Sequence, residues 1–174
     1  TPTPVPGMHS VGMSLNTSGP VALSRMRDVG VRWVRTSIAW SSVEPTNLDL
    51  TNPANGDWPD SWFQTLVNTY AFTPEVIIWK NPSWAAGTTC GPINQLSEFA
   101  QFVRALAARY DGDGDYNNDG TVDGPALPEV RYFELYNEPD FDLNNPNGEA
   151  DYGGCWGQAP NAYAEMLRTA YLAI

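Results

Sequence analysis

The sequence has few basic residues, two cysteines, one histidine and no long apolar run. Nine Lys and Arg stand against 20 Asp and Glu, so the formal net charge is −11. A surface this acidic repels phosphates, which excludes nucleic acid as a partner. The longest apolar runs, at residues 76–79 and 105–108, are far shorter than the roughly 20 residues of a membrane-spanning helix, which excludes a membrane protein.

The remaining composition predicts one folded domain. Apolar residues make up 42% of the 174 residues and aromatic residues 12%, enough to form a core despite the acidic excess. The first seven residues, TPTPVPG, alternate Thr with Pro as semi-rigid extracellular linkers do. We therefore assign residues 1–7 to a linker and residues 8–174 to the domain. This start and the acidic, Trp-rich, Lys-poor composition predict a secreted or extracellular protein.

Strand and helix patterns alternate four times along the domain. Short β-branched or aromatic runs occur at residues 10–15, 31–38, 75–79 and 130–136, and apolar residues at helical spacing follow each run. Helical crossovers between strands indicate a parallel sheet and the α/β class. A doubly wound sheet and a (β/α)8 barrel both fit this pattern. The first strand leads into SLNTSGP without a Gly-x-Gly-x-x-Gly motif, which disfavours a dinucleotide fold.

The number of units is half of what a closed barrel needs. A barrel takes eight units and about 250 residues, whereas the sequence contains four units. For the barrel we therefore expect a half-barrel, with two unpaired edges and an uncovered inner face. Its partner is either the missing C-terminal half or a second copy of the chain, which a two-fold axis places so that the sheet closes.

The fourth predicted strand ends in Asn137-Glu138-Pro139. Parallel α/β folds carry their chemistry at the carboxyl ends of strands, which makes Glu138 a candidate for proton exchange with a substrate. Strand alternation places Glu134, Tyr136 and Glu138 on one side and Asn137 on the other. Glu134 lies about 13 Å deeper along the strand, where Arg35 is its expected partner.

Three segments, in order, resemble the clan A glycoside hydrolases, which are retaining barrel enzymes. FELYNEPD is similar to their fourth strand with its Asn-Glu-Pro, VRWVRTSIAWSSVEP to the second strand and its loop, and EVIIWKNPSWA to the third strand with its Pro-x-Trp loop. Within this clan the segments most resemble the β-xylosidase and α-iduronidase family, and they do not separate it from cellulase-like relatives. The resemblance implies the N-terminal half of a TIM-type (β/α)8 barrel that acts on carbohydrate.

The resemblance also implies roles for single residues. Glu138 is the general acid/base, Asn137 binds the sugar hydroxyl beside the reacting carbon, and Arg35 holds the nucleophile ionised. These enzymes carry the nucleophile on strand seven, which this chain lacks, so we predict that the chain alone is inactive or nearly so. The alternative is a noncatalytic carbohydrate-binding or self-assembling half-barrel module with structural calcium.

Tryptophan and cysteine residues mark the same end of the expected barrel. Indole rings stack on the flat C–H faces of sugars, and four Trp at or just after strand ends are candidate platforms: Trp40, Trp79, Trp84 and Trp156. For the cysteines, the residues alone leave open a disulfide or two thiols. On the barrel implied by the resemblance, Cys90 and Cys155 follow the third and fourth strands and form a disulfide.

An acidic segment, DGDGDYNNDGTVDG, precedes the fourth strand. Six of its residues match the first, third, fifth, sixth, seventh and ninth places of an EF-hand-like calcium loop, but Ala126 stands at the twelfth place, where a bidentate carboxylate is usual. We predict a structural Ca²⁺ site on the face opposite the active site. Its candidate ligands are Asp111, Asp113, Asp115, Asn117, Asp119, Thr121 and Asp123.

Overall fold

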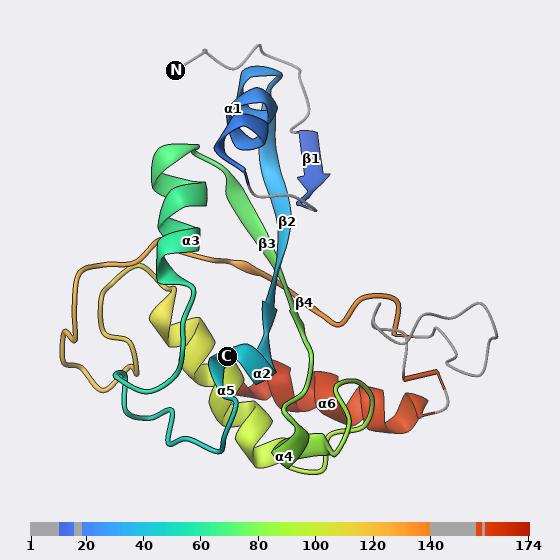
Figure 1. Cartoon of the computed structure of the whole chain (residues 1–174). Coiled ribbons are helices and arrows are strands. Elements are labelled where there is room, and N and C mark those ends of the chain that lie inside the picture. The colour runs from blue at the N-terminus through green and yellow to red at the C-terminus, as the bar shows by residue number, and fades with distance from the viewer. Residues whose placement is uncertain (1–10, 16–18, 140–155, 158) are drawn as a thin grey trace.

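The computed structural model describes residues 11–15, 19–139, 156–157 and 159–174. Four strands form one parallel sheet in the order β1-β2-β3-β4 (Figure 1). They are β1 (Val11–Ser14), β2 (Val31–Ala39), β3 (Thr73–Trp79) and β4 (Tyr132–Leu135). The predicted α/β class with parallel β/α units is thus confirmed. Residues 1–7 lie outside the described residues, and the linker assignment stays a prediction.

Helices follow each strand. They are α1 (Pro20–Asp28), α2 (Trp40–Val43), α3 (Asp60–Gln64), α4 (Ser83–Ala86), α5 (Leu96–Arg109) and α6 (Pro160–Ala173), and a π-helical turn, η1 (Thr65–Thr69), extends α3. Pro20 opens α1 because its fixed φ suits a first helical turn, and Gly30 at φ 94° follows its end. The short helices α2 and α4 were not predicted. No helix of the described ranges is long and apolar enough to cross a membrane.

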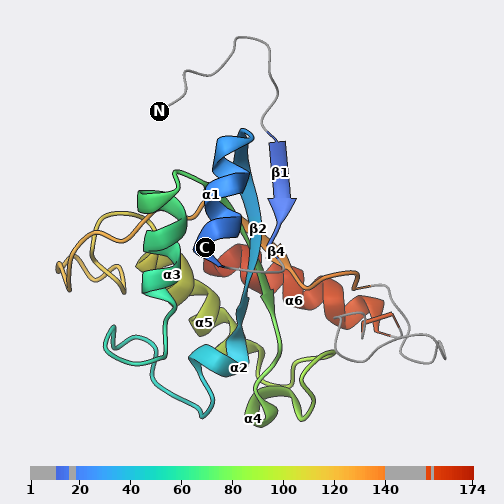
Figure 2. The same cartoon turned by 45° about the horizontal axis from the view of Figure 1, so that its top comes forward.

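One face of the sheet packs against helices. In both Figure 1 and Figure 2, α1 and α3 lie on the same side of β2 and β3. Alternate strand residues on this side are buried: Val34, Ile38, Val76 and Ile78. Ile38, Val76 and Ile78 pack in one core cluster with aromatic residues of α3 and α5, and Val34 belongs to a second cluster with Leu23 of α1.

The other face, which we call the inner face, is only partly covered. It is defined by Arg35, Ser37, Glu75, Ile77, Trp79 and Glu134. Ile77 aligns with Ser37 of β2 and with Glu134 of β4, which places the three side chains in one row across the sheet. Polar and charged groups therefore gather where the described residues leave the sheet open.

Candidate active site

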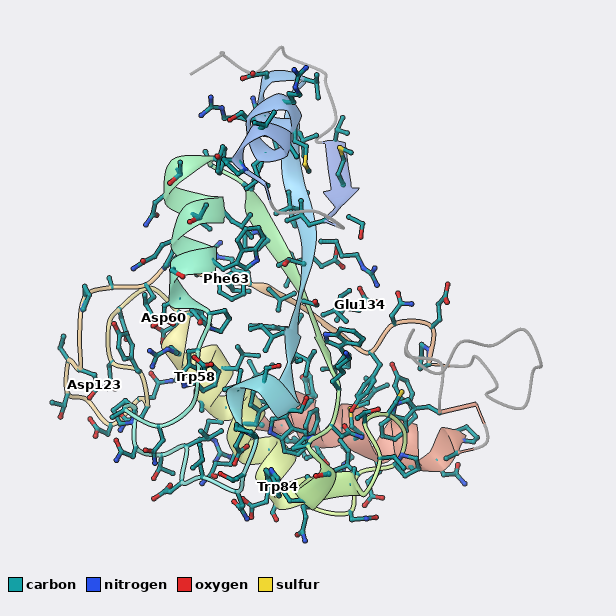
Figure 3. The ribbon with its side chains drawn as sticks, in the orientation of Figure 1. Trp58, Asp60, Phe63, Trp84, Asp123 and Glu134 are labelled. Atoms are coloured by element: carbon teal, nitrogen blue, oxygen red, sulfur yellow. The ribbon has the colours of Figure 1, made fainter. Side chains whose placement is uncertain are left out.

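Arg35 connects two strands that are not neighbours. Its Nε donates to Glu134 Oε2 at 2.7 Å, and its Nη2 donates to Glu134 Oε1 at 2.6 Å. Because β3 lies between β2 and β4, the side chain crosses the inner face of β3 to reach this carboxylate. Figure 3 shows Glu134 beside the strands, on the side away from Asp60 and Asp123. The structure thus contains the expected pairing of Arg35 with Glu134.

The chain turns sharply where β4 ends. Strand geometry stops at Leu135, and both Tyr136 (φ 60°) and Glu138 (φ 44°) adopt left-handed backbone conformations. The expected alternation beyond the strand is therefore wrong. Asn137 Oδ1 accepts a 2.7 Å hydrogen bond from Arg35 Nη2, so it lies with Glu134 instead of on the opposite side.

Tyr136 fastens this turn to the end of β3. Its hydroxyl donates to Oδ1 of the fully buried Asn81, and its backbone N–H donates to Ile78 O. Burial raises the pKa of the Tyr136 phenol well above its ordinary value, and the phenol therefore remains a hydrogen-bond donor at neutral pH. The segments that follow β3 and β4 are joined through these contacts.

Glu138 stands exposed at the carboxyl end of β4. The hydrogen bond from Arg35 to Glu134 raises the pKa of the guanidinium, partial burial lowers it, and the charges of Glu134, Glu75 and Glu138 raise it further. Arg35 is therefore a permanent cation. It is hydrogen-bonded to Glu134 and interacts electrostatically with Glu75 and Glu138. Within the described residues Arg35 contacts Glu134 and Asn137, and its expected role of holding a nucleophile stays a prediction.

A cavity lies beside Trp79 at the same end of the sheet. It measures about 380 Å³, and Ser37, Ala39, Ser42, Asp57, Trp79 and Lys80 are among its lining residues. Lys80 Nζ lies 4.5 Å from the centroid of the Trp79 ring. Of the four predicted platforms, Trp79 is the one that lines this cavity. Trp84 is half-buried, and its Nε1 donates to Glu44 O.

Two of the predicted platforms belong to the hydrophobic core. Trp40 is 1% exposed and contacts the rings of Phe99 and Phe102 on α5. Trp156 is also 1% exposed and lies edge-on to Tyr136 and Tyr163. Packing on these neighbours leaves neither indole with a face for a sugar.

The acidic segment forms a loop between α5 and β4. Asp115 is buried, and its carboxylate accepts hydrogen bonds from the N–H groups of Asp119 and Gly120. Asp111, Asp113 and Asp119 likewise accept from N–H groups two residues further on. In the part of the chain that is described, no group of three or more acidic, His or Cys side chains is arranged to hold a metal. The Ca²⁺ site stays a prediction.

Asn117 and Asp123 tie the same loop to its surroundings. Asn117 Nδ2 donates to Thr51 O, and Asp123 Oδ2 accepts from the N–H of Tyr116. Figure 3 shows Asp123 and Glu134 on opposite sides of the strands. The loop therefore lies away from the Arg35–Glu134 pair.

The predicted disulfide involves one described cysteine. Cys90 lies in the segment after α4 and is not a free thiol. Cys155 lies outside the described residues, so its pairing with Cys90 stays a prediction.

Two features of this region were not predicted. The Asn81–Tyr136 hydrogen bond depends on the left-handed backbone conformation of Tyr136, which no local sequence pattern predicts. Lys80, also left-handed at φ 52°, follows Trp79 directly at a strand end, and this pairing of a cation with an aromatic ring is a signal that the sequence does contain.

The fold is similar to that of a known hydrolase. No protein-family model and no curated protein matches the sequence. Among solved structures, a family 39 glycoside hydrolase from the gut symbiont Bacteroides cellulosilyticus WH2 matches with a TM-score of 0.51 and 15% sequence identity. The match covers 93% of this chain and 28% of that one. The chain therefore has an α/β fold of parallel β/α units that matches part of a family 39 glycoside hydrolase barrel.

Proposed function

We propose that this chain carries the general acid/base side of a retaining glycoside hydrolase site. The observation that carries the proposal is the position of Glu138. It stands exposed at the carboxyl end of β4, directly after Asn137, whose side chain Arg35 holds on the inner face. The carboxyl ends of the strands are the catalytic end of such barrels.

In this proposal Glu138 works twice. It first donates its proton to the glycosidic oxygen as the bond from that oxygen to the anomeric carbon breaks, and a second carboxylate attacks that carbon. Glu138 then removes a proton from water, which displaces the carboxylate and releases the sugar. Trp79 borders the adjacent cavity, where an indole face suits the C–H surface of a sugar.

In this proposal Glu134 is not the second carboxylate, which the family resemblance assigns to a seventh strand. Glu134 is the acidic residue nearest in sequence on β4, but Arg35 holds both of its oxygens. A nucleophile needs a free oxygen about 5 to 5.5 Å from the acid/base carboxyl. We therefore expect the chain alone to show little or no hydrolysis of aryl glycosides. Measurable hydrolysis that Glu138→Gln abolishes would place the nucleophile within this chain.

In a complex of this chain with the rest of a barrel that hydrolyses glycosides, the dependence of the rate on the leaving group tests the role of Glu138. With a poor leaving group, Glu138→Gln should lower kcat/KM by about 10²- to 10⁴-fold, because the departing oxygen needs a proton. With 2,4-dinitrophenolate, which leaves without protonation, the loss should be much smaller. Equal losses for both substrates would contradict a general-acid role.

A second candidate is a carbohydrate-binding half-barrel that pairs with another copy. Apolar side chains are exposed on edge strand β1 and around the C-terminal end of α6, and these side chains are Val11, Met13, Tyr171, Leu172 and Ile174. Exposed apolar groups at sheet edges favour association. Size-exclusion chromatography with light scattering tests this candidate: a two-copy mass supports it, and a monomer at every concentration contradicts it.

A further inference from the structure

The link from Glu134 through Arg35 to Asn137 is a feature that the proposed chemistry does not itself require. Three charge-assisted hydrogen bonds of 2.6 to 2.7 Å make up this link. A guanidinium has donors and no acceptor, so the atom that it contacts on Asn137 is the carboxamide oxygen. The NH2 end of Asn137 consequently points away from Arg35.

We propose that Glu134 is a positioning residue, which orients the carboxamide of Asn137 by holding the Arg35 guanidinium in one plane. The inference rests on the proposed function only for its purpose, since Asn137 directly precedes Glu138. Arg35 has a long side chain with many rotamers. A bidentate carboxylate removes that freedom, and the remaining Nη2 contact is then aimed at Asn137.

The backbone around Asn137 explains why such a constraint is useful. Tyr136 and Glu138 flank it, and both are left-handed. Each such residue is strained and persists only where surrounding contacts determine its conformation. Asn81 holds Tyr136 on one side of Asn137, and Arg35 holds Asn137 itself. The direction in which the chain enters Glu138 depends on both contacts.

Stability alone accounts poorly for the pair. The Arg35 and Glu134 side chains remain 30% and 29% exposed, and ion pairs so open to water contribute little to the free energy of unfolding. A second bidentate pair, Arg109 with Asp60, has the same contact of 2.6 Å but Arg109 is 11% exposed. It lies on the helical side of the sheet and is a matched structural control.

The test follows the side-chain NH2 signals of Asn137 by ¹⁵N NMR, with Asn137→Asp to assign them. Glu134→Gln removes one acceptor oxygen and the negative charge. Arg35→Lys keeps the positive charge but removes the planar guanidinium that makes the bidentate contact. We expect both variants to shift the Asn137 NH2 signals, because the hydrogen bond from Arg35 Nη2 to the carboxamide oxygen is lost or weakened. We expect Asp60→Asn to lower stability and leave these signals in place.

Three results would overturn the inference. They are unchanged Asn137 signals in Glu134→Gln, unchanged signals in Arg35→Lys, and an equal shift in Asp60→Asn. No sugar and no turnover enter this measurement. Failure of the positioning role is therefore separate from failure of the proposed function, which the leaving-group dependence of Glu138 variants reports.

Discussion

The buried carboxylate of Glu44 accepts a 2.7 Å hydrogen bond from the indole Nε1 of Trp40. Its other oxygen accepts from the N–H of Leu48 at 2.9 Å, and the side chain is fully enclosed. The two bonds anchor the segment that follows α2. They also place an ionisable group where water does not reach it.

Glu44 makes stability depend on pH in a definite direction. Burial raises the pKa of Glu44 above its ordinary value, although the hydrogen bonds from Leu48 and Trp40 act in the opposite sense. The folded chain then holds this proton more tightly than the unfolded chain does. The contribution of Glu44 to the free energy of unfolding is therefore full below the ordinary carboxyl pKa and declines as pH rises to the raised value.

Denaturant unfolding of the wild type and Glu44→Gln from acidic to neutral pH measures this contribution. The difference between the two proteins cancels the titration of the carboxylates that they share. We expect the wild type to lose stability relative to the variant as pH rises through this window. A difference that stays constant, or that grows in favour of the wild type, would contradict the buried environment of Glu44.

Asp60 is expected to be a strong contributor to stability. Arg109 donates to both of its oxygens, at 2.9 and 2.6 Å, and the Tyr110 hydroxyl donates at 2.8 Å. Asp60→Asn turns one acceptor into a donor that faces a cation, which should lower the free energy of unfolding by about 1–3 kcal/mol. Urea unfolding checks this value, and an unchanged midpoint would show that the pair contributes nothing.

The strands were predictable because their signal is local. The run VRWVRTSI predicts a strand over residues 31–38, and the structure contains β2 there. Trp40 shows what a local pattern does not predict. Its position after a strand is typical of a loop residue, but its burial depends on Phe99 and Phe102, which are distant in sequence. The turn at Tyr136 and Glu138 was missed for the same reason, since Asn81 and Arg35 stabilise left-handed conformations that the local sequence disfavours.

Calcium should stabilise the loop between α5 and β4. The carboxylates of this loop carry like charges close together, and a cation would relieve their repulsion. We expect Ca²⁺ to raise the free energy of unfolding by about 2.7 kcal/mol at a free concentration 100 times Kd. The unfolding midpoint should rise with it, and EGTA should reverse the rise. Asp115→Ala should abolish the effect, whereas Asp28→Ala, at an exposed site at the end of α1, should preserve it. An unfolding midpoint that EGTA does not change would contradict the predicted Ca²⁺ site.

Cys90 and Cys155 should resist alkylation until a reductant is added. Native disulfides contribute about 2–5 kcal/mol in small secreted domains, so Cys90→Ser should lower the unfolding midpoint. Mass spectrometry after treatment with iodoacetamide in denaturant counts the thiols. Two alkylated cysteines without reductant would refute the pairing.

The most direct measurement for the central claim is affinity labelling of Glu138. A β-xylosyl or β-glucosyl amine that carries a bromoacetyl group brings an electrophilic carbon to the place of the glycosidic oxygen. The nearby carboxylate displaces bromide and forms an ester, and this step needs no second carboxylate. Peptide mapping should find one ester, at Glu138, which excess free sugar suppresses and Glu138→Gln eliminates. Labels spread over other carboxylates, with Glu138 unmodified, would contradict a sugar site at the end of β4.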